Sequence, residues 1–143
     1  MKYGYLKLNG EAVWQQSFLG EHPNELGSHM FIVDTSDCTL QEYRYYNTYA
    51  DATAAARLRG FIQGLSDGTV LVGVSADEAS IYLEKAKATL TGLGADVSDV
   101  GYRGAWAFVA VIGDQSQTVL DKELTEASAT ERQPVITVYF AGA

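Results

Sequence analysis

Side chains able to carry out catalytic or metal chemistry are few in this sequence. His22 and His29 flank a predicted loop, and neither a nucleophile motif nor a third orienting group accompanies them. The single cysteine, Cys38, has no basic neighbour to favour its reactive thiolate. Asp77 and Glu78 are adjacent, so they point in different directions on the helix expected there. The sequence therefore predicts a protein that is not an enzyme and that uses no metal or other cofactor.

Charge and length narrow the class of partner. The chain has 143 residues, 18 acidic against 10 basic, and a net charge of −8. Nucleic-acid binding needs clustered lysine and arginine to meet phosphates, so no nucleic-acid partner is expected. No apolar run approaches the roughly 18 residues of a membrane span, and residues 1–7 lack the apolar stretch of a signal peptide. With no repeats or linkers, residues 1–143 are expected to form a single domain.

The first part of the chain favours strands. Asn9-Gly10 accepts the backbone angles of a type I′ turn, so residues 3–18 predict a hairpin. Met30–Val33 is a short apolar run, typical of a strand buried on both faces. A polar turn at residues 34–37 leads into another strand at Leu40–Tyr46, which predicts a second hairpin.

Two helices are expected in the middle of the chain. After Asp51, apolar residues recur at the spacing of one helix face, at Leu58, Phe61, Ile62 and Leu65. A second helix is expected to begin at Ser75, because Ser75 and Glu78 have the spacing of a capping box. Its apolar stripe runs from Ala79 to Leu93.

Three more strands are expected, at Thr69–Val74, Trp106–Ile112 and Pro134–Phe140. Residues 113–132 are polar with weak apolar periodicity, and they predict a long surface excursion of no recognisable secondary structure. Strand pairs segregated from the helices predict an α+β fold, with two antiparallel sheets packed as a sandwich-like core and two flanking helices.

Aromatic residues suggest either a surface patch or core packing. Four tyrosines could contribute to a binding patch: Tyr43, Tyr45, Tyr46 and Tyr49. Alternation along the strand predicts that only some of these four face outward. Trp106 opens an apolar strand and is expected in the core.

The order of several motifs resembles the interleukin-like EMT inducer, or PANDER-like, family. Phe31–Asp34 and Tyr46–Asp51 resemble the family's opening strands and the entry to its first helix, and Val74–Ala79 is similar to its strand-to-helix turn. Gly101–Val109 resembles its Gly-aromatic-Arg signature ending in Trp-Ala-Phe. The resemblance covers about residues 5 to 112 and extends to the stem domain of protein O-mannose N-acetylglucosaminyltransferase.

The resemblance implies a fold of paired antiparallel sheets with two helices, and a sugar site. That stem domain binds β-linked N-acetylglucosamine through an aspartate and an arginine, whose positions correspond to Asp77 and Arg103 here. A carboxylate accepts hydrogen bonds from vicinal hydroxyls, a guanidinium offers a fixed fork of donors, and Tyr102 offers a ring for stacking. A second interpretation stays open, since an Asp–Arg pair can be a purely structural ion pair.

Two departures from the family pattern affect the expected ligand. Gly104 and Ala105 stand where the family has Asp and Ser or Thr, and one cysteine cannot form the disulfides of the secreted cytokine-like members. We predict a non-catalytic, lectin-like carbohydrate-binding module for a small glycan such as a β-linked N-acetylhexosamine. The alternative is a protein-interaction or assembly domain of a cell-surface, secreted or virion attachment protein. The resemblance favours an extracellular, cell-surface or virion location over the cytoplasm, and the sequence does not predict the oligomeric state.

Overall fold

The computed structural model describes residues 5–15 and 26–138. At the start of the chain, β1 (Tyr5–Leu8) pairs antiparallel with β2 (Glu11–Gln15). The turn residues Asn9 and Gly10 have φ angles of 52° and 80°, as a type I′ turn requires. The hairpin predicted from Asn9-Gly10 is confirmed, and its expected ends at residues 3–4 and 16–18 lie outside the described residues.

A large antiparallel sheet, with strand order β4-β3-β5-β6-β7, occupies the centre of the described chain. Its strands are β3 (Gly27–Asp34), β4 (Thr39–Tyr46), β5 (Val70–Ala76), β6 (Ala105–Val111) and β7 (Asp114–Glu123). The apolar and alternating runs that predict β3 to β6 are confirmed. β7 falls in a stretch with no readable pattern, because a strand at the edge of a sheet tolerates polar side chains.

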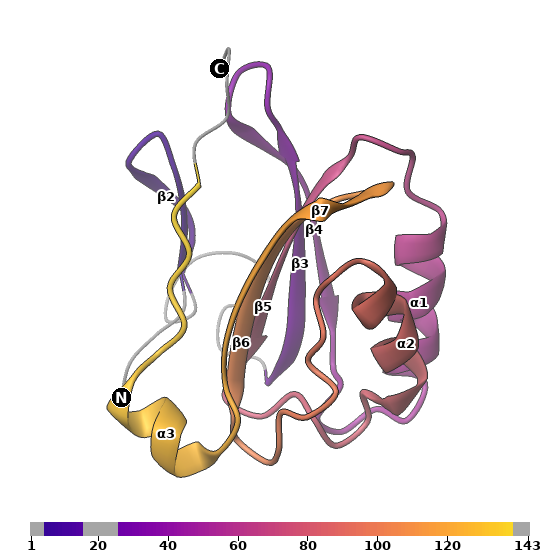
Figure 1. Cartoon of the computed structure of the whole chain (residues 1–143), viewed down its shortest axis with the longest axis vertical. Helices are drawn as coiled ribbons and strands as arrows, with labels where there is room; N and C mark the ends of the chain where they lie inside the picture. The colour runs from indigo at the N-terminus through magenta and orange to yellow at the C-terminus, as the bar shows by residue number, and fades with distance from the viewer. Residues whose placement is uncertain (1–4, 16–25, 139–143) are drawn as a thin grey trace.

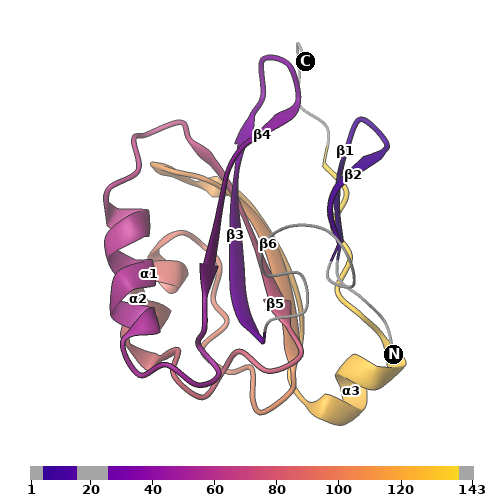
Figure 2. The ribbon, with the colours of Figure 1, turned by 180° about the vertical axis from the view of Figure 1, so that it is seen from behind.

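Two layers cover the faces of the large sheet. Helices α1 (Ala54–Gln63) and α2 (Glu84–Gly92) lie on one face (Figure 1). The β1–β2 hairpin and the C-terminal residues 132–138 lie on the other (Figure 2). Alternate residues of β3 serve the two layers, since Met30 packs with the helices and Phe31 with the hairpin. The expected α+β fold, with two antiparallel sheets in a sandwich-like core, is confirmed.

The second helix begins later than predicted. Strand β5 continues to Ala76, and α2 starts at Glu84. The expected capping box at Ser75 and Glu78 is therefore wrong. The Ser75 hydroxyl instead accepts a hydrogen bond from the Trp106 backbone N–H at 2.9 Å, which ties the end of β5 to the start of β6.

The chain after β7 also differs from expectation. A short helix, α3 (Glu126–Glu131), follows β7 and begins with a capping box between Thr125 and Ser128. The predicted strand at Pro134–Phe140 is wrong for residues 134–138, which form no strand, and residues 139–140 lie outside the described part. Polar contacts hold this segment instead: the Val135 N–H donates to the Asp121 carboxylate at 2.9 Å.

No helix in residues 5–15 or 26–138 is long and apolar enough to span a bilayer. That the whole chain forms a single domain stays a prediction.

Candidate functional site

The end of the large sheet at which β5 finishes and β6 begins positions the three candidate residues. β5 and β6 are antiparallel neighbours, with Val74 opposite Ala107. This register brings Asp77, just past the end of β5, to the same end of the sheet as Tyr102 and Arg103, just before β6. It is the lower end of the sheet in Figure 1. The two loops meet at the surface, as the sugar-site hypothesis requires.

Arg103 lies at the centre of this group. Its Nε is 3.3 Å from Asp77 Oδ1, and its Nη1 donates to Glu126 Oε2 at 3.2 Å. Its guanidinium carbon lies 5.5 Å from the centre of the Tyr102 ring, within the range of a cation–π contact. The hydrogen bond to Glu126, followed by the charge of Asp77, raises the pKa of Arg103. The side chains of Arg103 and Asp77 are 43% and 38% exposed, so the pair is open to solvent and to a ligand.

The backbone at this pair adopts an unusual conformation. Asp77 and Arg103 have φ angles of 54° and 55°, the left-handed region that favours glycine. It costs about 1–2 kcal/mol for a residue such as Arg103, whereas aspartate adopts it more readily. Such conformations persist where neighbouring contacts enforce them, and they concentrate at functional sites.

Glu78, next to Asp77 in the sequence, is fully buried and contacts both loops. Its carboxylate accepts hydrogen bonds from the Ser80 hydroxyl at 2.8 Å and from the backbone N–H groups of Ser80 and Ile81 at 3.0 and 3.1 Å. Across 25 residues of sequence it also accepts from the Arg103 N–H at 2.9 Å. Glu78 thus joins the two loops that carry the candidate pair. Sequence reasoning missed this role, because no local pattern reveals a partner so far along the chain.

Close packing explains one departure from the family pattern. Gly104 is buried, and a Cβ atom there would lie 2.6 Å from Val100 Cγ1 and 2.7 Å from the Glu123 carbonyl oxygen. An aspartate cannot be accommodated at this position without moving β7. The polar group that the family places here is therefore excluded by the local backbone path.

Comparison with known proteins assigns a family to the chain. The model of the family described as interleukin-like EMT inducer matches residues 26–114. The chain belongs to the interleukin-like EMT inducer family. It is also similar to the cell migration-inducing and hyaluronan-binding proteins of Mus musculus and Homo sapiens, each 27% identical over 138 residues. These alignments cover 84% of this chain and 10% of each relative, so the chain corresponds to a small part of those proteins.

The family match includes Asp77, Glu78, Tyr102 and Arg103, whereas Glu126 on α3 lies beyond its limit at residue 114. The second acid on Arg103 is therefore contributed by a segment outside the matched part of this interleukin-like EMT inducer domain.

Exposed apolar side chains lie on the loops that carry the pair and on the chain just after β7. Tyr102 is 55% exposed and Tyr82 is 41% exposed. The Tyr82 N–H donates to the Thr48 carbonyl at 2.7 Å, which joins the loop after β5 to the loop before α1. Ile81 and Leu124 are exposed on the same end of the domain. This end therefore offers aromatic and aliphatic surface beside charged groups.

The remaining aromatic residues considered from the sequence differ in their burial. Tyr46 and Trp106 are buried, which confirms core packing for both. Tyr43 and Tyr45 are partly buried, and the rings of both lie against His29. Of the four tyrosines considered from the sequence, Tyr49 is the exposed one. A continuous tyrosine patch on β4 is not formed.

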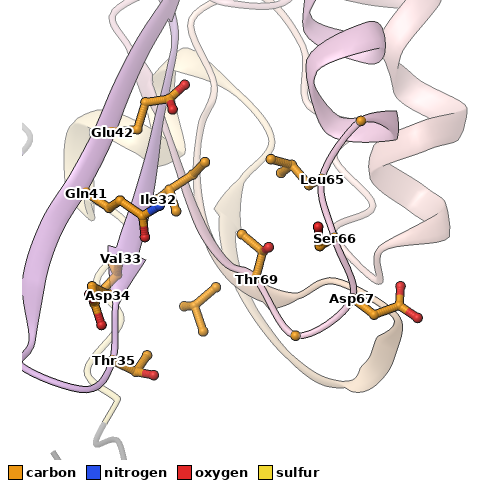
Figure 3. Close-up of a pocket in the computed structure, with 13 residues that line it drawn as sticks. Ile32, Val33, Asp34, Thr35, Gln41, Glu42, Leu65, Ser66, Asp67 and Thr69 are labelled. Carbon is orange, nitrogen blue, oxygen red and sulfur yellow. The ribbon is translucent and has the colours of Figure 1, made fainter.

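A groove of about 550 Å³ lies at the opposite end of the sheet (Figure 3). It runs between the end of the β3–β4 hairpin and the loop from α1 to β5, with Ile32 and Leu65 among its apolar contacts and Asp34, Glu42 and Asp67 among its acids. None of the three candidate residues lines it. Sequence reasoning did not find this groove, because its walls come from segments with ordinary turn composition.

The described residues contain no group of three or more histidine, cysteine or acidic side chains arranged to hold a metal ion. His29 is buried and its Nδ1 lies 2.6 Å from the Tyr43 hydroxyl, while His22 lies outside the described residues. Cys38 is partly buried in the β3–β4 turn.

Proposed function

We propose that this chain is a non-catalytic carbohydrate-binding module and that Asp77, Arg103 and Tyr102 contact the sugar. The ligand class is a small glycan containing a β-linked N-acetylhexosamine. The observation that carries the proposal is the exposed Asp77–Arg103 pair, with Nε and Oδ1 3.3 Å apart, set beside the exposed ring of Tyr102.

The chemistry of the three groups suits a sugar. The Asp77 carboxylate accepts hydrogen bonds from hydroxyls, and the guanidinium of Arg103 retains N–H donors beyond those directed at its acidic neighbours. Tyr102 provides an apolar ring face with a polar tip. Glu78 fixes the loops before a ligand arrives, which reduces the entropy lost on binding.

Membership of the interleukin-like EMT inducer family and similarity to proteins named as hyaluronan-binding support a glycan ligand. The same similarities support an extracellular location, where glycans are displayed.

A glycan array tests the proposal with a matched pair of variants. Arg103→Ala is expected to weaken binding about tenfold or more, because hydrogen bonds from a charged group are lost. Arg57→Ala is the control: Arg57 is also exposed, also pairs with an aspartate, Asp51 at 2.6 Å, and also lies near a tyrosine ring, Tyr46 at 6.0 Å. Equal losses in the two variants, or a blank array for the wild type, would refute the proposal.

A protein-interaction role is the second candidate. It is favoured by Ile81 and Leu124, aliphatic side chains that are 47% and 42% exposed at this end of the domain and have no use in stacking on sugars. A blank array, together with self-association in light scattering that Ile81→Asp abolishes, would select this role.

A further inference from the structure

The charges around Arg103 restrict which glycan the proposed site accepts. Arg103 is paired with two carboxylates, Asp77 on one side and Glu126 on the other. One positive charge and two negative charges leave this cluster with a net charge of −1. The Glu126 side chain is 58% exposed, so its charge faces the solvent from which a ligand arrives.

Among the described residues, the exposed apolar side chains named above at this end of the sheet carry no positive charge. Tyr102, Tyr82 and Ile81 are uncharged. Two basic residues from this part of the chain are already paired: Lys122, in β7, with Asp99, and Arg132, after α3, with Asp121 and Glu123. The whole chain carries a net charge of −8. An anionic ligand therefore meets repulsion both at long range and at the site.

We propose that the site selects uncharged sugars and discriminates against chains that contain uronic acids. This inference rests on the proposed glycan-binding function and specifies its ligand class. A hydroxyl or an acetamide oxygen accepts from Arg103 without displacing Glu126. A uronate carboxylate competes with Glu126 for the guanidinium and lies close to Asp77.

Glu126 is the residue that sharpens this preference. It lies on α3, outside the part of the chain that matches the family model, and it reaches Arg103 across 23 residues of sequence. A domain with the same Asp–Arg pair but no acid at this position would present one negative charge fewer. Similarity to hyaluronan-binding relatives therefore does not transfer their anionic ligand to this site.

The test compares two ligands that differ at the glucuronate carboxyl groups, which are charged in one and replaced by neutral alcohols in the other. Calorimetric titration of the full chain would use a hyaluronan tetrasaccharide and the same tetrasaccharide after reduction of its glucuronate carboxyl groups to alcohols. The reduced, uncharged form is expected to bind about two- to fivefold tighter, the size of effect that one charge contact gives at an exposed site. Native hyaluronan binding as tightly or more tightly would overturn the inference and leave the glycan-binding function intact. Failure of both ligands, and of uncharged N-acetylglucosamine oligosaccharides, would remove the glycan-binding function and this inference with it.

Glu126→Gln assigns the cause. The variant keeps the side-chain size and removes one negative charge. The ratio of the affinities for the uncharged and the native tetrasaccharide is therefore expected to fall toward one. Glu131→Gln removes a charge at the other end of the same helix, outside the Asp77–Arg103–Glu126 cluster, and is the control that is expected to leave the preference unchanged. An unchanged preference in Glu126→Gln, or equal narrowing in both variants, would overturn the role of Glu126.

Discussion

Replacing the buried carboxylate of Glu78 by an amide should release Arg103 from its fixed position. In the native chain, Oε2 accepts from the N–H groups of Ser80 and Ile81, and Oε1 accepts from the Ser80 hydroxyl and the Arg103 N–H. In Glu78→Gln, one oxygen becomes an NH2 group. The lower-energy orientation places this NH2 at the Oε1 position, because the Ser80 hydroxyl can turn to accept, whereas the two backbone N–H groups at Oε2 cannot.

The substitution removes the hydrogen bond from the Arg103 N–H. The Arg103 N–H then faces another donor and loses its acceptor. A hydrogen bond to a charged group contributes about 1.5–3 kcal/mol, so Glu78→Gln should lower the free energy of unfolding by about 2 kcal/mol. That is a substantial share of the roughly 5–15 kcal/mol typical of a folded domain.

Two measurements test this reasoning. Urea unfolding at neutral pH gives the stability change, with Glu84→Gln as the control. Glu84 is 85% exposed and paired with Lys87 at 3.2 Å, so its loss should cost less than about 0.5 kcal/mol. Amide hydrogen exchange should show faster exchange at Arg103 than in the wild type, with Ser80 and Ile81 still protected. If Arg103 exchanges at the native rate in Glu78→Gln, the carboxylate does not hold the two loops together and the reasoning fails.

Two further predictions concern packing and pH. Gly104→Ala should destabilise the fold by about 1–3 kcal/mol, because its Cβ would lie 2.6 Å from Val100 Cγ1 and 2.7 Å from the Glu123 carbonyl oxygen. Gly92→Ala, with open space around its Cβ, is the control in urea unfolding. Equal stability of the two variants would contradict the prediction. Hydrogen bonds from Arg132 lower the pKa of Asp121. The pair therefore stabilises the fold above the unfolded aspartate value of about 3.9, and this contribution is lost as pH falls through the lower folded value. The difference in unfolding free energy between wild type and Asp121→Asn should be present at neutral pH and should shrink as the pH falls to about 2, below the reference aspartate pKa. A difference independent of pH would show that the charge of Asp121 is not its cause.

The elements that could be predicted from sequence are those with a local cause. Asn9-Gly10 sets its own turn, and the apolar run Met30–Val33 is long enough to require burial on both faces. The period of α1 is likewise local, and its buried residues include Leu58 and Ile62. These signals depend on neighbouring residues alone, so reading along the chain finds them.

The failures share a different cause. Ser75 and Glu78 have capping-box spacing, but Ser75 bonds to Trp106 and Glu78 to Arg103, residues that become neighbours only when β5 pairs with β6. β7 is hidden because an edge strand needs little apolar surface. The same reasoning applies to the candidate site: family resemblance predicts Asp77 and Arg103, whereas the contact of Glu126 depends on where α3 lies after folding.

The buried attachment of the two loops at Glu78 suggests how this domain can change what it recognises. Loops that project from the end of a rigid sheet can vary in sequence without disturbing the layers beneath them. Here the anchoring carboxylate sits below the surface, while the exposed side chains beside it, such as Ile81 and Tyr102, contribute little to the core. Randomising those outer positions while leaving the anchor intact would give a library of domains with a common frame and new specificities, in the manner of a small antibody-like scaffold.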